Sequence, residues 1–431
     1  MPTSYQFENR GLYFSDSNGG IHLGEKLTIS ERLSEPFTIE GILISNSFSL
    51  EEQLGQTFCC HWNEVIDEKQ NEKRVFHGYL TSVQLLDGQG DDNYRQYKIT
   101  LRPWLWLLTL RKNYRVFQQQ TLANILSSVF DDAGFSGNYT LGNLPTSERN
   151  YCVQYNETDF DFVQRLLAEQ GIHYFFNHTS SAHQLKLQDP SCPYEDATVD
   201  KLEYISSRTG ELSLLTKWQP QLNLHASAIN AVNYDYQTNQ VVDSGKKAST
   251  NKIANTAKLT QYEFGSNSIT GDMQDLSATV SANKLNQLQS NYSRVDAKSF
   301  VEDLAIATQF SLTAHPDSSQ LGEYIVEEVI HHINALEQSV DYHNSFVCRS
   351  TAHPSYPNPI SKPIINGLQT AIVIGGDNGQ PQHDVNGRIK VQFHWDTVSS
   401  DSPSCWIRVA QTMASSGLGM QFIPRVGDEV L

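Results

Sequence analysis

The feature of this sequence that most constrains its fold is a strict alternation of apolar and polar side chains, clearest in GRIKVQFHWD at residues 387–396. Successive side chains of a β-strand point to opposite faces, so this period predicts a strand with one buried and one solvated face. We expect the apolar register to fill a small barrel and the polar register to face outward. The apolar positions are Ile389, Val391, Phe393 and Trp395, and the polar positions are Arg388, Lys390, Gln392 and His394.

Strand signals extend over most of the chain. Residues 1–102 predict short strands, because turn sequences such as DSNGG and LDGQGDDN cut the segment at short spacing, which is typical of a sandwich or barrel. Residues 201–352 are strand-like again. Within them the polar stretch 237–295 predicts a long surface excursion with a helix around 272–290.

The C-terminal part begins after a proline-rich segment. Residues 353–365, which include HPSYPNPISKP, predict a linker in extended conformation and a domain boundary. Residues 366–431 predict four short strands of a small barrel of the oligonucleotide/oligosaccharide-binding (OB) type. Because the last predicted strand is incomplete and would leave its neighbour's edge without a partner, we expect the natural chain to continue beyond residue 431.

An α+β insert is predicted between the two β regions, at residues 103–200. Two segments in it show apolar residues at helical spacing. Thr121 and Thr158 occupy the N-cap positions of these helices, and Gly134 and Gly171 lie where each helix is expected to stop.

Composition excludes several classes of protein. The formal net charge of −17 disfavours nucleic acid as a partner, because the basic residues form no block that could offset the acidic excess. The longest apolar runs are far shorter than a bilayer requires. The N-terminus, MPTSYQFENR, lacks the basic start and apolar block of a signal peptide, so we expect the chain to fold in the cytoplasm.

The sequence predicts neither an enzyme nor a cofactor. The motifs G-x-S-x-G, H-E-x-x-H, C-x-x-C and the Walker loop are all missing from it. Asp159 and Asp161 could be proposed as a pair of catalytic carboxylates, but their place in the first turn of a helix explains them better through the helix dipole. Most of the six cysteines lie among apolar or aromatic residues, and they are expected to be buried free thiols.

The histidines offer only a weak case for a metal site. His331 and His332 are neighbours in a predicted strand and therefore point to opposite faces. His394 on its polar register is expected to be a surface residue. A zinc site is conceivable, though disfavoured, at His173, His178 and His183.

Several long blocks resemble one family. GRIKVQFHWD, SCWIRVAQ and QFIPRVG, in this order, resemble the signature block of VgrG, the spike protein of the bacterial type VI secretion system. YKITLRPWLWLL and YCVQYNETDFDFVQRLLAEQGIHYFF resemble earlier segments of that family. The chain departs from the family at Met413, Ala414 and Ser415 and in the polar stretch 237–295. The C-terminal signature positions are Gly387, Arg388, Val391, Phe393, His394, Trp395, Trp406, Arg408, Pro424 and Gly427.

The resemblance implies an architecture and a set of partners. It implies a mainly β fold with an α+β insert, in which two hub-type β-barrel domains precede an OB-like spike barrel and, past residue 431, a β-helix. It further implies a homotrimer on the hexameric inner tube, with a PAAR-repeat tip protein and effectors bound through the part beyond this chain. Such a protein is cytoplasmic before firing and is then delivered across the target envelope, and it binds no nucleic acid.

Two alternatives remain open from the sequence. One is a phage-type tail spike with muramidase activity, whose paired acids would lie in a domain beyond residue 431. The other is a carbohydrate- or nucleic-acid-binding module built on the small barrel, which would need exposed aromatic residues and a basic groove.

Overall fold

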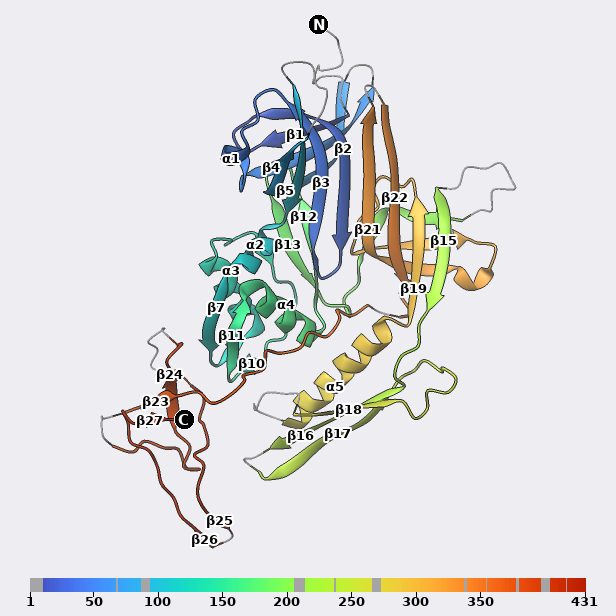
Figure 1. The fold of residues 1–431 in the computed structure, drawn as a ribbon. Coiled ribbons are helices and arrows are strands. Elements are labelled where there is room, and N and C mark those ends of the chain that lie inside the picture. The colour runs from blue at the N-terminus through green and yellow to red at the C-terminus, as the bar shows by residue number, and fades with distance from the viewer. Residues whose placement is uncertain are drawn as a thin grey trace.

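The computed structural model describes most of the chain. The described residues are 11–66, 69–86, 94–204, 214–235, 238–265, 273–336, 339–353, 355–376, 380–396, 404–415 and 417–431. Figure 1 shows a β-barrel at the N-terminal end, a second sheet beside it, an α+β insert below the barrel, and the C-terminal domain beyond the insert. Within these residues no helix is both long and apolar enough to span a bilayer.

Six antiparallel strands close the first barrel. Their order is β1-β4-β5-β6-β3-β2, and β2 pairs again with β1, so the ring has no free edge. Small residues let the barrel pack tightly, since a Cβ at Gly41 would lie only 2.8 Å from the ring of Phe14. The bounds are β1 (Leu12–Asp16), β2 (Ile21–Arg32), β3 (Glu35–Ser45), β4 (Thr57–Ile66), β5 (Lys69–Leu85) and β6 (Arg95–Arg102), with α1 (Leu50–Gln53) between β3 and β4.

A second sheet of six strands joins the barrel through one seam. Strand β2 pairs with β21 from Lys26 and Asn334 to Arg32 and Glu328, which makes a continuous twelve-stranded sheet. The second sheet runs β14-β20-β21-β22-β19-β15, and its end strands β14 and β15 do not pair with each other in the described part of the chain. The bounds are β14 (Glu195–Glu203), β15 (Leu215–Leu222), β19 (Ser293–Ser299), β20 (Thr308–Ala314), β21 (Gly322–Leu336) and β22 (Ser339–Ser350).

The α+β insert shares its hydrophobic core with the first barrel. Trp104, Phe130 and Phe162 of the insert belong to the same buried cluster as Phe14 and Trp62 of the barrel. The helices are α2 (Trp104–Leu107), the 3-10 turn η3 (Leu108–Leu110), α3 (Leu122–Asp132) and α4 (Asp159–Gln170). The strands are β7 (Lys112–Phe117), β8 (Gln120–Thr121), β9 (Tyr139–Thr140), β10 (Glu148–Arg149), β11 (Cys152–Thr158), β12 (His173–His178) and β13 (His183–Gln188).

The polar stretch folds into a small unit of its own. The helix expected around residues 272–290 is α5 (Met273–Ser290). The preceding residues form a three-stranded sheet in the order β17-β16-β18. Its central strand lies in the predicted strand-like region before residue 237, whereas the two outer strands, inside the polar stretch, were not predicted. Its strands are β16 (Ala228–Asp235), β17 (Gln240–Ala248) and β18 (Thr260–Phe264).

The C-terminal domain has less regular structure than predicted. Three strands pair in the order β24-β23-β27, and a short hairpin of β25 and β26 projects from them. The predicted strand SCWIRVAQ is reduced to a single bridge between Ile389 and Ile407. The bounds are β23 (Ala371–Ile374), β24 (Lys390–Phe393), β25 (Ala414–Ser415), β26 (Leu418–Gly419) and β27 (Glu429–Val430). The mainly β class with an α+β insert is confirmed.

Candidate functional site

The predicted chemistry-bearing residues do not converge on a reaction centre. Among the described residues, no group of three or more His, Cys, Asp or Glu side chains is placed to hold a metal ion. His173 hydrogen-bonds to Ser34, with 2.7 Å between Nδ1 and Oγ, whereas His178 and His183 turn toward His77. All six cysteines are free thiols, and the four at Cys59, Cys60, Cys152 and Cys348 are buried as expected. The structure instead brings residues together at three joints between its parts.

The first joint is an aromatic clasp between the C-terminal domain and the insert. Trp395 packs against Tyr114 of β7 and Tyr155 of β11, with ring centroids 5.5 and 5.8 Å apart. Its indole Nε1 donates a hydrogen bond of 3.0 Å to Gln369, whose amide in turn donates to the Tyr155 hydroxyl. Phe393 also stacks on the indole, with ring centroids 5.1 Å apart. The clasp therefore links two elements that are more than two hundred residues apart in the chain.

This arrangement corrects one prediction. Trp395 was expected inside the small barrel, yet the buried cluster there consists of Ile389 and Val391 with Ala371 and Val373. The prediction was wrong because β24 ends at Phe393. Side chains alternate between the two faces of a sheet only within a strand, and Trp395 lies beyond its end.

The polar register of the same strand makes local contacts. Arg388 forms an ion pair with Asp384, and the Nε of Arg388 donates at 2.6 Å. Lys390 lies over the ring of Trp406, 5.2 Å from its centroid. His394 is exposed and lies 3.6 Å from Glu429. The outward direction predicted for this register holds at His394, while Arg388 is largely covered by its partner.

The remaining signature positions are spread along the turns and edges of the C-terminal domain. Gly387 and Gly427 have positive φ angles of 69° and 95°, where a side chain would be strained. Trp406 and Pro424 are half-buried, and Arg408 is exposed. Their part in the function stays a prediction.

The buried carboxylate of Asp159 connects β7 and β11, the two strands that carry the tyrosines of the clasp. Asp159 was assigned to the helix dipole of α4, but its side chain is fully buried. It accepts hydrogen bonds of 2.8 Å from both Asn113 of β7 and Gln154 of β11, and Arg115 lies 3.4 Å away. Asp159 thus ties together the two strands that present the tyrosines. The sequence carried no signal for this role, because the partners lie on β7, more than forty residues before Asp159, and on the irregular end of β11.

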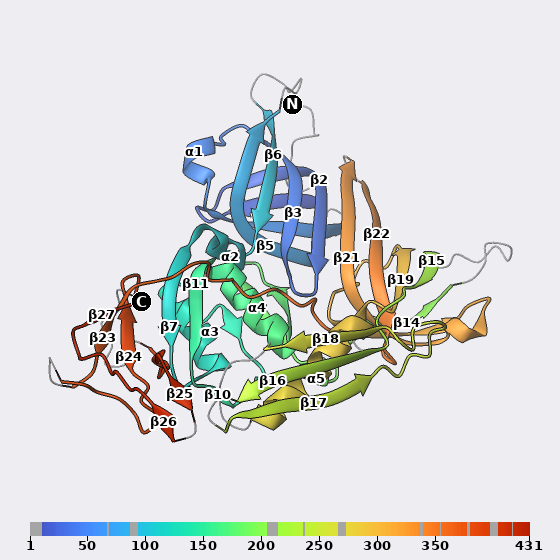
Figure 2. The ribbon, with the colours of Figure 1, turned by 60° about the horizontal axis from the view of Figure 1, so that its bottom comes forward.

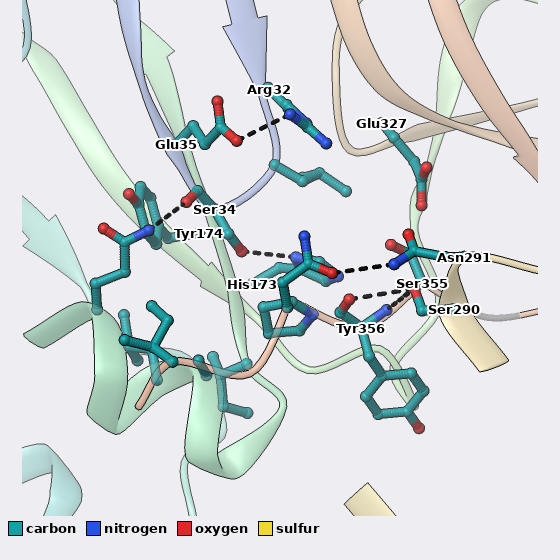
Figure 3. Close-up of a pocket in the computed structure, with 18 of the residues that line it drawn as sticks. Arg32, Ser34, Glu35, His173, Tyr174, Ser290, Asn291, Glu327, Ser355 and Tyr356 are labelled. Carbon is teal, nitrogen blue, oxygen red and sulfur yellow. Dashed lines mark hydrogen bonds and ion pairs between the residues drawn. The ribbon is translucent and has the colours of Figure 1, made fainter. Parts of the chain in front are cut away.

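The second joint lies around a cavity of about 140 Å³, where the proline-rich segment meets the ends of α4 and α5 (Figure 3). The backbone N–H of Tyr356 donates to Ser290 Oγ at 3.0 Å, and this hydroxyl donates back to the carbonyl of Tyr356 at 3.2 Å. A side chain at Gly171 would lie 3.0 Å from the Tyr356 ring. The segment is therefore fastened to the ends of α4 and α5 and does not behave as a free tether.

The same cavity is where the turn between β2 and β3 meets the second sheet. Leu33 N–H donates to the carbonyl of Glu327, and Ser34 N–H donates to that of Tyr174. Glu327 and Arg349 form a bidentate ion pair with distances of 2.8 and 3.1 Å. Burial alone would raise the pKa of Glu327, but the Arg349 guanidinium, a hydrogen bond from Ser355 and the nearby His173 together outweigh burial and lower that pKa. A bidentate pair of this kind restricts the relative orientation of its two side chains, because both hydrogen bonds must be kept.

The third joint is a set of hydrogen-bonded histidines between the first barrel and the insert. His183 Nε2 accepts from the Trp104 N–H at 2.9 Å, so its Nδ1 carries the proton and donates to His77 Nδ1 at 3.0 Å. The backbone N–H of His77 donates to His178 Nδ1 at 3.2 Å. Burial lowers the pKa of His77 to about 4 and that of His183 to about 2. His77 and His183 therefore act as uncharged structural connectors.

Comparisons with known proteins agree with this architecture. Residues 30–337 match the family profile of the phage tail baseplate hub (GPD), and residues 371–431 match the type VI secretion system/phage-baseplate injector OB domain. The type VI secretion system spike protein VgrG1b of Pseudomonas aeruginosa is 30% identical over 428 residues, which cover 93% of this chain and 55% of that protein. The chain thus spans about half the length of this relative.

Two further proteins are similar over most of this chain. The actin cross-linking toxin VgrG1 of Vibrio cholerae is 28% identical over 418 residues, which cover 89% of this chain and 36% of the toxin. A solved structure of an E. coli type VI secretion component, described as similar to the phage T4 tail proteins gp27 and gp5, superimposes with a TM-score of 0.66. That match has 16% identity and covers 96% of this chain and 94% of the other. The chain therefore belongs to the phage tail baseplate hub family, and over most of its length it is similar to the VgrG spike proteins of type VI secretion systems.

Proposed function

We propose that this chain is the hub and the first spike domain of a type VI secretion spike. In this role three copies cap the hexameric inner tube, and the assembly is driven through a target membrane by mechanical force. The observation that carries the proposal is the order of two domains in one chain, a baseplate hub at 30–337 and an injector OB domain at 371–431.

The three joints support a mechanical role. Force applied at the hub would pass to the C-terminal domain through the Trp395 clasp and the fastened segment at 355–360. The barrel has no free edge, and its core continues into the insert. Such a part works by resisting deformation, and it makes and breaks no bond itself.

The partners follow from the same proposal. We infer that the inner-tube protein binds the hub, and that a PAAR-repeat tip protein and effectors bind through the part of the full protein beyond this chain. One solved structure holds a Francisella VgrG in complex with PdpA, which supports a VgrG spike as a binding partner for other proteins. The protein would reside in the cytoplasm before firing and leave with the inner tube.

An enzymatic role would belong to another part of the full protein. The Vibrio cholerae relative carries a toxin name, but this chain covers only 36% of it. The comparisons give the muramidase alternative no support, and we do not propose it.

The proposal is tested by deleting the gene in the source bacterium and measuring release of the inner-tube protein into the medium. Release is expected to stop and to return when the full gene is restored. A restored gene with Trp395→Ala should give less release than one with His394→Ala, because only the first breaks the clasp. Unchanged release in a strain without any other spike gene would refute the proposal.

A further inference from the structure

Two histidines face each other across neighbouring strands of the second sheet. His332 of β21 pairs directly with His343 of β22 in the antiparallel register. Their rings are stacked, with centroids 4.8 Å apart and an angle of 25° between the ring planes. Directly opposed residues of an antiparallel pair point to the same face of the sheet, so both imidazoles share one face. Figure 2 shows β21 and β22 side by side, next to β2 of the first barrel.

The face that the two rings share is turned away from the buried core. The neighbouring His331 is fully buried on the core side, whereas His343 is exposed and His332 is partly exposed. Thr28 of β2 lies on the same outward face, because it pairs with His332 across the seam. A solvated ion can therefore reach both rings without any opening of the fold.

The spacing of the two rings suits a shared metal ion. A divalent ion such as zinc binds imidazole nitrogen at about 2.0–2.1 Å, so two nitrogens on one ion lie about 3 Å apart. With their centroids 4.8 Å apart, the rings of His332 and His343 reach this arrangement by rotation about χ2, a torsion that is broad for histidine. The backbone pairing already holds the two side chains opposite each other, so the strands need not move.

His332 is in the protonation state that binds metals. Burial lowers the pKa of His332, and His343, Lys26 and Lys298 lower it further. The ring is therefore neutral at about pH 7, and only a neutral ring offers a lone pair to a metal. The two lysines repel a metal ion as they repel a proton, but a proton binds one ring whereas a metal ion binds both. Asp341 lies on the same face, two positions before His343, and supplies a charge of the opposite sign.

We propose that His332 and His343 form a surface chelate for a divalent late first-row transition metal ion, with copper(II) bound most tightly. Imidazole suits copper, nickel and zinc, and the affinity of a given site reaches its maximum at copper(II). The two rings supply two donors, and water completes the coordination. This inference goes beyond the proposed mechanical function and does not depend on it. The sequence could not show the site, because the second ligand comes from the neighbouring strand.

The test is a calorimetric titration of copper(II) into the 431-residue chain at about pH 7, in a buffer that does not bind copper. The natural chain is compared with His332→Gln, with His343→Gln and with the double variant. Each single substitution should weaken one site by roughly tenfold or more, since even the loss of a group that only orients a ligand costs that much. The double variant should lose no more than either single variant, because the two rings act as one unit.

The matched control is His394→Gln, which removes an exposed histidine outside the pair and should leave this site unchanged. Affinity that survives either single substitution would overturn the proposal. Losses that add up in the double variant would mean two separate contacts of one ring each and would also overturn it. A loss of the same size in the control would show that copper binds the histidines of this chain without preference, again against the proposal.

A measurement on the natural chain guards against misfolding of the variants. Diethyl pyrocarbonate modifies neutral imidazoles, and peptide mass spectrometry reports each histidine separately. Copper(II) at about ten times its dissociation constant should slow modification of His332 and His343 by roughly tenfold, because only the unbound fraction reacts. His394 should react at its original rate. Equal protection of all three histidines, or protection of neither member of the pair, contradicts the chelate.

Discussion

At the scale of single residues, Trp395 was expected in the core of the small barrel, but its side chain packs between the C-terminal domain and the insert. Its indole has partners on β7, on β11 and on the segment before β23. Each contact is modest, with aromatic pairs contributing about 0.5–1.5 kcal/mol beyond their buried area. Together they hold the C-terminal domain against the insert.

Replacing Trp395 with Ala is expected to weaken this docking by about 2 kcal/mol, the sum of the lost aromatic contacts and of one hydrogen bond. Limited proteolysis in the exposed stretch 364–368 measures the effect. Cleavage should become faster by roughly tenfold or more. The cleavage rate of Trp395→Phe should fall between those of the natural chain and Trp395→Ala. His394→Ala, which alters an exposed neighbour, should leave the cleavage rate unchanged. Equal cleavage of the Trp395→Ala variant and the natural chain would show that the clasp does not hold the domain.

The buried histidines predict how stability depends on pH. The pKa of His77 and of His173 is lowered by burial from 6.5 to about 4, and that of His183 to about 2. Below pH 6.5 the unfolded chain therefore binds protons that the folded chain does not. The free energy of unfolding should be highest above pH 6.5 and fall toward pH 4, by up to ~1.4 kcal/mol per pH unit for each histidine.

This expectation is checked by urea unfolding at constant ionic strength and at several pH values between about 7.5 and about 4.5. The charged groups that act on His173 are Glu327 and Arg349, whereas His77 and His183 face other histidines. His394→Gln is the control, because it removes an exposed histidine and leaves the three buried ones in place. A free energy of unfolding that stays level down to pH 5 would contradict neutral burial of these histidines.

At the scale of elements, the helices of the insert follow their sequence signals closely. Thr121 accepts from the Asn124 N–H and Thr158 from the Asp161 N–H, so both predicted N-caps are confirmed. Gly171 takes the left-handed conformation at the end of α4, with φ of 75°. Caps are readable from sequence because their contacts lie within three or four residues.

Thr158→Ala is expected to lower the free energy of unfolding by about 1 kcal/mol, because α4 loses its N-cap hydrogen bond of 3.0 Å. The midpoint of urea unfolding measures this loss. Thr158→Ser keeps the hydroxyl and should recover most of the stability. An alanine variant as stable as the serine variant would mean that the cap contributes nothing measurable.

At the scale of the whole molecule, the cores differ in size. The barrel and the insert form one large buried cluster, whereas the buried cluster in the described part of the C-terminal domain is small and consists of Ala371, Val373, Ile389 and Val391. The free energy of opening a region follows its buried apolar contacts. The barrel and insert should therefore open together, and the C-terminal domain should open first.

Hydrogen exchange followed by mass spectrometry tests this order. Amides of β23 and β24 should exchange at lower urea concentrations than those of β3 and α4. The amides of β3 and α4 should share one opening transition despite lying in separate segments. Separate transitions for the barrel and the insert would show that their shared cluster does not couple them.

The sequence by itself determined the mainly β class, the capped helices, the proline-rich boundary and the family, because these depend on periodicity, on local hydrogen bonds and on long characteristic blocks. Only the tertiary structure decided where Trp395 packs, what Asp159 binds and that strands of the polar stretch pair with β16 in one sheet. These features depend on partners that are remote in the chain, and neither alternation nor spacing records which remote segment a side chain will meet. The seam between β2 and β21 is of the same kind, since its two strands are separated by about three hundred residues.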